Sequence, residues 1–174
     1  IFRKKIMSTI FNKISVIGLG LIGTSILHAI KVKGDQKIIT FAYDINPEHR
    51  SIVSEMEIAS YVCEDIKEAI KSSDLVILAI PVGAMKSVAE LISSHLKPTA
   101  IVTDTGSTKL SVIRDVMSFI PNNNHFIPSH PLAGTEYSGP KSGFSTLFEN
   151  RYWLIVCDRE TKQTKDLARF FKRL

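Results

Sequence analysis

The chain has 174 residues, of which 44% are hydrophobic and 22% are charged, with a formal net charge of +5 and a sequence pI near 9.2. This length and composition fit one globular domain with a substantial core and exclude an intrinsically disordered chain. The basic residues gather near the two ends and do not alternate with aromatic residues, so the charge does not predict nucleic-acid binding. A mildly positive protein equally suits an anionic small substrate or cofactor.

The first methionine is Met7, so we set residues 1–12 apart as an N-terminal extension and take residues 13–174 as the domain. Residues 14–30 are nearly apolar over the length of a membrane span, but their three glycines occur where a strand has to turn. We therefore expect a cytoplasmic protein with neither a secretion signal nor a membrane helix. Cys63 and Cys157 lack disulfide or metal-ligand spacing, so we expect free thiols and no metal site.

Apolar β-branched runs alternate along the chain with stretches of helical periodicity. The predicted strands cover residues 13–18, 38–43, 75–80, 100–103, 125–128 and 152–157. The predicted helices cover residues 21–33, 47–56, 64–71, 83–95, 108–119 and 161–173. This alternation is typical of an α/β fold with a doubly wound, mostly parallel, Rossmann-like sheet that helices cover on both faces.

The first predicted strand leads into a glycine-rich turn, VIGLGLIGTS, in which Gly18, Gly20 and Gly23 are spaced as G-x-G-x-x-G. Gly18 permits a tight turn, Gly20 lets the backbone approach a pyrophosphate, and Gly23 lets helix and strand pack closely. The next helix begins with free N–H groups that attract anionic oxygens. The motif predicts a dinucleotide site, and a glycine-rich turn without a ligand is the alternative. The cofactor residues expected from this turn also include Leu19, Leu21 and Ile22.

Asp44 follows the second predicted strand, 21 residues after Gly23 (44 − 23). A carboxylate at this place accepts hydrogen bonds from the ribose hydroxyls of the adenosine and repels a 2′-phosphate, so it favours NAD over NADP. The alternative is that Asp44 caps the helix that begins near Pro47. His49 and Arg50 nearby leave some room for a phosphate.

Ligands of an open α/β sheet bind outside the carboxyl ends of its strands, so the residues that follow the strands meet in one cleft. Further cofactor contacts are therefore expected from Ile45, Pro81, Val82, Thr105 and Ser107. The stretch PSHPLAGTEYSGP, residues 128–140, is too rich in Pro and Gly for a helix or a central strand and is expected to form a shaped surface turn. Its His130 should lie on the same rim, where a nicotinamide ring would present C4.

These motifs resemble the nucleotide-binding half of the prephenate dehydrogenase family, which includes arogenate and cyclohexadienyl dehydrogenases. The resemblance rests on GLGLIGTS, VTDTGSTK, SHPLAGTEYSGP and GFSTLFENRYWLIV and covers about residues 13–160. It implies NAD-dependent oxidative decarboxylation of prephenate or arogenate in tyrosine biosynthesis. The family continues into a C-terminal all-helical domain that forms the dimer and contributes cationic contacts to the substrate, and we expect that domain to be absent from this chain.

The resemblance also implies roles for single residues. His130 is expected to accept the proton of the substrate hydroxyl, and Ser107 to hydrogen-bond to that hydroxyl or to His130. Thr135 and Glu136 are expected to shape the substrate side of the pocket. A histidine suits the role of base because its ordinary pKa of about 6.5 leaves it mostly neutral near pH 7. The alternatives are that His130 bonds only to the loop backbone, that Ser107 caps a helix, and that Glu136 is a solvated loop carboxylate.

Two other functions stay open at this point. One is a sister dehydrogenase that acts on a different β-hydroxy acid, although the hydroxyisobutyrate group is expected to use a lysine base and this chain offers His130 instead. The other is a nucleotide-binding module without turnover. We expect the partner to be a small-molecule substrate rather than nucleic acid or a membrane, and a homodimer only with the helical domain. The chain alone is expected to bind NAD but to turn over prephenate poorly.

Overall fold

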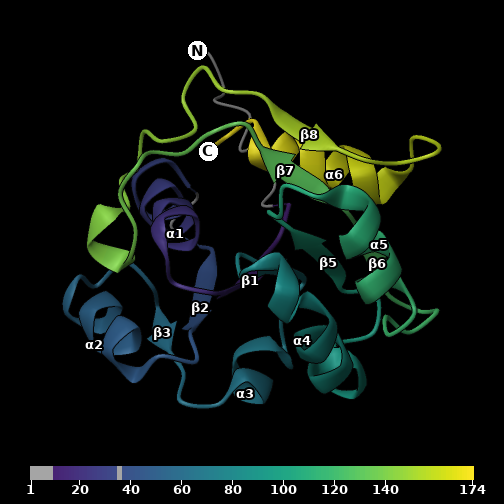
Figure 1. Cartoon of the computed structure of the whole chain (residues 1–174), viewed down its shortest axis with the longest axis horizontal. Helices are drawn as coiled ribbons and strands as arrows, with labels where there is room; N and C mark the ends of the chain where they lie inside the picture. Colours follow the sequence, from purple (N-terminus) through teal and green to yellow (C-terminus); the bar gives the residue numbers. More distant parts are fainter. Residues whose placement is uncertain (1–9, 35–36) are drawn as a thin grey trace, which may run out of the picture.

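The structure, a computed structural model, describes residues 10–34 and 37–174 (Figure 1). A six-stranded parallel sheet in the order β3-β2-β1-β4-β5-β6 forms its centre. The strands of this sheet are β1 (Lys13–Ile17), β2 (Ile39–Tyr43), β3 (Tyr61–Val62), β4 (Leu75–Leu78), β5 (Ile101–Asp104) and β6 (His125–Ile127). Two short strands, β7 (Ser129–Pro131) and β8 (Trp153–Ile155), form a separate two-stranded sheet.

Six α-helices connect or flank the strands within the described residues. They are α1 (Leu21–Lys33), α2 (Pro47–Glu55), α3 (Ile66–Ile70), α4 (Met85–Ile92), α5 (Lys109–Met117) and α6 (Lys162–Phe171). The predicted helix 83–95 is α4 with one 3₁₀ turn at each end, η1 (Val82–Ala84) and η2 (Ser93–His95), and a third 3₁₀ turn is η3 (Pro140–Ser142). None of the helices that the structure describes combines the length and hydrophobicity of a bilayer crossing.

The sheet separates two apolar cores, because successive side chains of a strand point to opposite faces. On β1, Ile14 and Val16 pack in the core that includes residues of α1 and α6, whereas Ile17 packs in the core that includes residues of α3, α4 and α5. Figure 1 shows the helices lying around the sheet in this way. The predicted doubly wound Rossmann-like fold is therefore confirmed. Four apolar residues of α6 and the chain just after it are buried, namely Leu167, Phe170, Phe171 and Leu174.

The N-terminal extension predicted for residues 1–12 lies mostly outside the described residues. Within its described part, Phe11 is buried, and its ring lies edge-on to that of Phe170, with 5.7 Å between centroids. The main-chain N–H of Asn12 donates to the carboxylate of Asp74 at 2.9 Å. These residues therefore pack with the domain.

Two expectations about strands are wrong. The strand predicted at 152–157 was expected to continue the parallel sheet, but β8 pairs antiparallel with β7, and the sixth parallel strand is the two-residue β3. The stretch 128–140 was expected to be a surface turn, and residues 132–138 are indeed irregular and mostly exposed, but Ser129 and Pro131 are buried within β7. The reason is a partner far along the chain: Trp153 stacks on Phe171 with 3.9 Å between ring centroids and donates its Nε1–H to Ser129 Oγ at 3.0 Å.

The order of the central strands locates the ligand-binding end of the sheet. The chain moves outward through β1, β2 and β3, then crosses back to place β4 on the other side of β1. This reversal opens a crevice at the carboxyl ends of β1 and β4, which is where doubly wound folds bind their ligands.

Candidate active site

A cavity of about 870 Å³ lies at the carboxyl ends of the central strands, and it is larger than four other cavities around the described residues. It brings together residues from six separate segments of the chain, including Gly20, Pro81, Ser107 and His130 as the sequence predicts. The predicted site residues that line it are Gly18, Gly20, Leu21, Ile22, Asp44, Ile45, Pro81, Val82, Thr105, Ser107 and His130. This volume and largely pre-formed shape suit a small-molecule or cofactor site.

The glycine-rich turn has the shape that a dinucleotide needs. Gly18 has φ of +96°, and a Cβ there would lie 2.3 Å from the carbonyl oxygen of Ala79. A Cβ on Gly23 would lie 1.9 Å from the carbonyl oxygen of Gly18, so α1 packs against the turn too closely for any side chain. At Gly20 a Cβ would meet nothing within 4 Å, which leaves the backbone open to the cavity. Leu19 and Gly23 are buried behind the turn and shape it from inside.

Asp44 places a carboxylate in the lining of this cavity, directly after β2. Its Oδ2 accepts the main-chain N–H of Leu19 at 2.6 Å, and its Oδ1 accepts the N–H of Asn46 at 2.8 Å. His49 Nδ1 lies 3.3 Å from Oδ2. The cap of α2 is Asn46, whose side chain accepts the N–H of Glu48, so the alternative reading of Asp44 as the helix cap is wrong. Asp44 instead ties the end of β2 to the glycine-rich turn and adds negative charge to the lining of the cavity.

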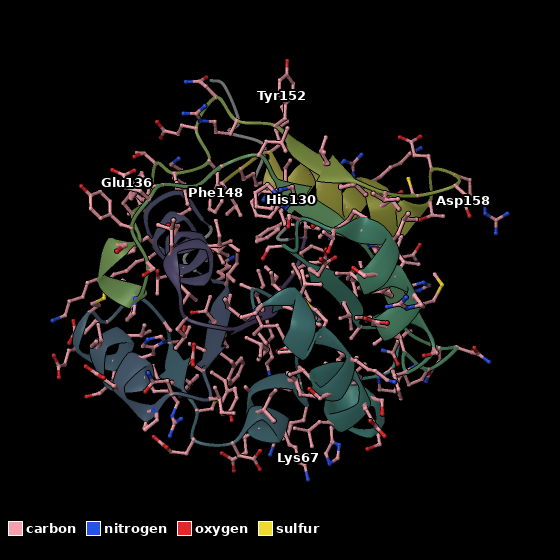
Figure 2. All side chains as sticks on the ribbon, viewed as in Figure 1. Lys67, His130, Glu136, Phe148, Tyr152 and Asp158 are labelled. Carbon is pink, nitrogen blue, oxygen red and sulfur yellow. The ribbon has the colours of Figure 1, made fainter. Side chains whose placement is uncertain are left out.

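His130 occupies the middle of β7 and points into the same cavity, and Figure 2 shows it inside the outline of the molecule. Its Nδ1 lies 2.8 Å from the carbonyl oxygen of Thr105. A carbonyl only accepts hydrogen bonds, so the neutral ring carries its proton on Nδ1 and has a lone pair on Nε2. Among the described residues, Nε2 has no hydrogen-bond partner. His130 therefore bonds to the backbone, and it also presents a basic nitrogen that no other described residue binds.

A buried ion pair lies beside His130, and the sequence did not predict it. Asp104, the last residue of β5, is fully buried and accepts a hydrogen bond from Lys109 Nζ at the start of α5. The same ammonium donates to the carbonyl oxygen of Ser129 at 2.5 Å. Burial lowers the pKa of Lys109, while the hydrogen bond and charge of Asp104 oppose that shift. The only signal in the sequence is an aspartate that ends a strand five residues before a lysine in DTGSTK (109 − 104).

The remaining predicted residues differ in their placement. Ser107 is exposed and lines the cavity, and Thr108 rather than Ser107 is the N-cap of α5, so the capping alternative is not observed. Thr135 and Glu136 are exposed and do not line this cavity. Glu136 lies at the periphery of Figure 2, well away from His130 in that view. Within the described residues, the structure thus brings most of the predicted cofactor residues and His130 to one cavity but leaves Thr135 and Glu136 apart from it.

The antiparallel ribbon of β7 and β8 has one buried and one exposed face. His130 pairs with Leu154, and side chains directly opposite each other lie on the same face. Trp153 and Ile155 pack toward the core, whereas Leu154 is 48% exposed. Alternation along the strands places further exposed side chains on the face of His130, namely Leu132, Tyr152 and Val156. Apolar surface therefore borders the histidine.

Comparison with known proteins gives the family. The family described as "Prephenate dehydrogenase, nucleotide-binding domain" matches residues 26–174. The chain belongs to this family. A cyclohexadienyl dehydrogenase from Zymomonas mobilis is 39% identical over 153 residues, which is 88% of this chain and 52% of that protein. A prephenate dehydrogenase from Bacillus subtilis is 30% identical over 89% of this chain and 42% of its own length. The chain thus spans about half the length of these curated relatives.

Solved structures agree with the family assignment. Prephenate dehydrogenase from A. aeolicus, in complex with hydroxyphenyl propionate and NAD⁺, superposes with a TM-score of 0.83 at 26% identity, over 98% of this chain and 58% of that one. A 3-hydroxyisobutyrate dehydrogenase from Mycobacterium tuberculosis superposes with a TM-score of 0.67 at 16% identity over 91% of this chain and 49% of that one, which shows the shared fold alone. The family's nucleotide-binding domain is therefore recognisable in both sequence and structure.

Proposed function

We propose that this chain binds NAD in the cavity at the carboxyl ends of the strands and supplies the base for oxidative decarboxylation of prephenate or arogenate. The observation that carries the proposal is His130, whose Nδ1–H is held by the Thr105 carbonyl so that Nε2 faces the cavity as a proton acceptor. Family membership and the NAD⁺-bound A. aeolicus relative support the same chemistry.

The residues present fit a dinucleotide. Gly20 leaves space where a pyrophosphate would approach the backbone, and α1 begins there without a side-chain cap, so its first N–H groups are available to phosphate oxygens. Asp44 would accept the ribose hydroxyls and disfavour a 2′-phosphate. Pro81 and Val82 line the cavity after β4 and would hold the nicotinamide end. NAD⁺, when bound, accepts a hydride.

The chain's own part in the reaction is proton transfer and positioning. His130 Nε2 would take the proton of the ring hydroxyl while the hydrogen on the same carbon leaves as hydride. The electrons of the bond to the ring carboxylate then enter the ring, and carbon dioxide departs. Ser107 lies on the rim of the cavity, where its hydroxyl would hydrogen-bond to the substrate hydroxyl. General base catalysis of this kind contributes about 10²–10⁴-fold to the rate.

Two measurements test this function. Titration calorimetry should show that the chain binds NAD⁺, and an assay of NADH formation with prephenate and with arogenate should show the slow turnover expected of this chain alone and its substrate preference. His130→Asn should leave the Kd for NAD⁺ nearly unchanged and lower kcat by roughly 10²–10⁴-fold, because a base acts in the transition state. Failure to bind NAD⁺ contradicts the cofactor assignment, and a His130→Asn protein with normal turnover contradicts the role of the base.

A further inference from the structure

The buried pair of Asp104 and Lys109 bonds to the main chain immediately before His130. Two main-chain hydrogen bonds flank the pairing of β7 with β8. The N–H of Val156 donates to the carbonyl of Pro128 at 2.9 Å, and the N–H of Leu132 donates to the carbonyl of Tyr152 at 2.8 Å. Ser129 bonds instead to the ion pair. Its N–H donates to Asp104 Oδ1 at 3.1 Å, and its carbonyl accepts from Lys109 Nζ at 2.5 Å. The ion pair thus satisfies the N–H and the carbonyl of Ser129, which a neighbouring strand would otherwise bind.

The same carboxylate also binds the main chain next to Thr105, the residue whose carbonyl accepts the hydrogen bond of His130 Nδ1. Asp104 Oδ2 accepts the N–H of Gly106 at 2.8 Å, which closes a turn around Thr105. The carbonyl of Thr105 is the group that lies 2.8 Å from His130 Nδ1. One carboxylate therefore fixes both the residue before the histidine and the residue after its hydrogen-bond acceptor.

We propose that Asp104 and Lys109 are positioning residues that hold His130 in the tautomer with the proton on Nδ1, so that Nε2 can accept a proton from the substrate. This inference rests on the proposed function, because it concerns the base of that reaction. Removing the ammonium would free the Ser129 carbonyl and leave the carboxylate alone in the interior. The distance and angle between His130 Nδ1 and the Thr105 carbonyl would then no longer be held, and the other tautomer would gain population.

Nuclear magnetic resonance of the ¹⁵N-labelled chain tests the inference without any ligand. Above the ordinary histidine pKa, at pH 8, long-range ¹H–¹⁵N spectra report which ring nitrogen carries the proton. His130→Asn identifies the signals of His130 by their loss. We expect the unaltered chain to show the Nδ1–H form, and Lys109→Met to lose most of that signal in favour of Nε2–H. The matched control is Lys97→Met, which breaks the ion pair with Asp74 and should leave the His130 spectrum unchanged.

A second variant covers the case in which Lys109→Met does not fold. Asp104→Asn combined with Lys109→Met removes both charges, so no carboxylate is left buried alone. Observation of the Nε2–H form in the unaltered chain overturns the inference, as does a folded variant of either kind that keeps the full Nδ1–H signal. The same samples are titrated with NAD⁺, and an unaltered chain that fails to bind contradicts the proposed function while leaving the tautomer result intact.

Discussion

Two carboxylate–ammonium pairs with the same bonding pattern lie at opposite ends of the central sheet. At the carboxyl end, Asp104 accepts the N–H groups of Gly106 and Ser129 together with Lys109 Nζ. At the amino end, just before β4, Asp74 accepts two main-chain N–H groups, from residues 12 and 13, together with a lysine Nζ at 2.5 Å. That lysine is Lys97.

The two pairs differ in their exposure to water. The side chains of Lys109 and Asp104 are 17% and 0% exposed, whereas those of Lys97 and Asp74 are 45% and 23% exposed. Water screens the outer pair and competes for its hydrogen bonds, so breaking it costs little. In the interior a single unpaired charge is very unfavourable, so each partner of the inner pair depends on the other. The same pair of groups is therefore expected to contribute little to stability at the amino end and to hold the main chain beside His130 firmly at the carboxyl end.

The largest expected effect comes from breaking the inner pair. Lys109→Met leaves the Asp104 carboxylate buried without a cation, and the free energy of unfolding should fall by about 3–5 kcal/mol. Urea denaturation followed by circular dichroism measures the loss. Asp104→Asn in the same chain as Lys109→Met should recover part of it, because no lone charge remains. A loss below about 1 kcal/mol for Lys109→Met would mean that the inner pair behaves like an exposed one.

Asp44 is another carboxylate at the carboxyl end of the sheet, and we expect it to affect cofactor binding. Asp44→Ala should weaken NAD⁺ binding by about 10-fold or more, since a hydrogen bond to a charged group contributes about 1.5–3 kcal/mol. The difference in affinity between NAD⁺ and NADP⁺ should also become smaller, because the repulsion of a 2′-phosphate is removed. Calorimetry with both cofactors measures this, with Asp65→Ala as the control because Asp65 caps α3 and does not line the cavity. Equal affinity of the unaltered chain for both cofactors would contradict the role of Asp44.

The outer pair should be nearly dispensable. Lys97→Met is expected to lower the free energy of unfolding by only about 0–1 kcal/mol, because both side chains are partly exposed and the carboxylate of Asp74 keeps its main-chain donors. The same urea titration used for Lys109→Met gives a direct comparison. A loss as large as that of the inner pair would remove the distinction that burial makes between the two.

The smallest expected effect is an acid titration of the outer pair. Burial raises the pKa of Asp74, but hydrogen bonds from Lys97, Lys13 and Asn12 and the charge of Lys97 outweigh it and lower the pKa below its ordinary value of 3.8. The unfolded chain thus binds this proton first as the pH falls. The contribution of Asp74 is present above pH 3.8 and is lost as the pH falls through the folded-state pKa. Asp74→Asn should flatten stability against pH in that window, and an unchanged slope would show that Asp74 is not the group involved.

Local signals in the sequence were sufficient for the cofactor side of the molecule. The helix predicted at 21–33 is α1 with the same bounds, because its apolar periodicity is long and a glycine-rich turn precedes it. Gly18 and Gly23 occupy positions where any Cβ would collide with main-chain carbonyls, so the residue type itself reports the geometry. The alternation of β-branched runs with helical periodicity likewise determined the doubly wound sheet. In each case the residues that carry the signal are neighbours in the chain.

The tertiary structure alone decided the surroundings of the histidine. The sequence contains SHP and, some twenty residues later, YWLIVC, but neither stretch shows that Ser129 pairs with Ile155 or that β8 leaves the parallel sheet. Strand pairing depends on partners distant in sequence, and β3 has only two residues, too few for a periodic pattern. The bonds from Asp104 and Lys109 to the main chain of Ser129 span 25 and 20 residues, so no local pattern predicts them. A buried charge pair is stable only in the geometry that satisfies it, and that geometry is a property of the folded chain.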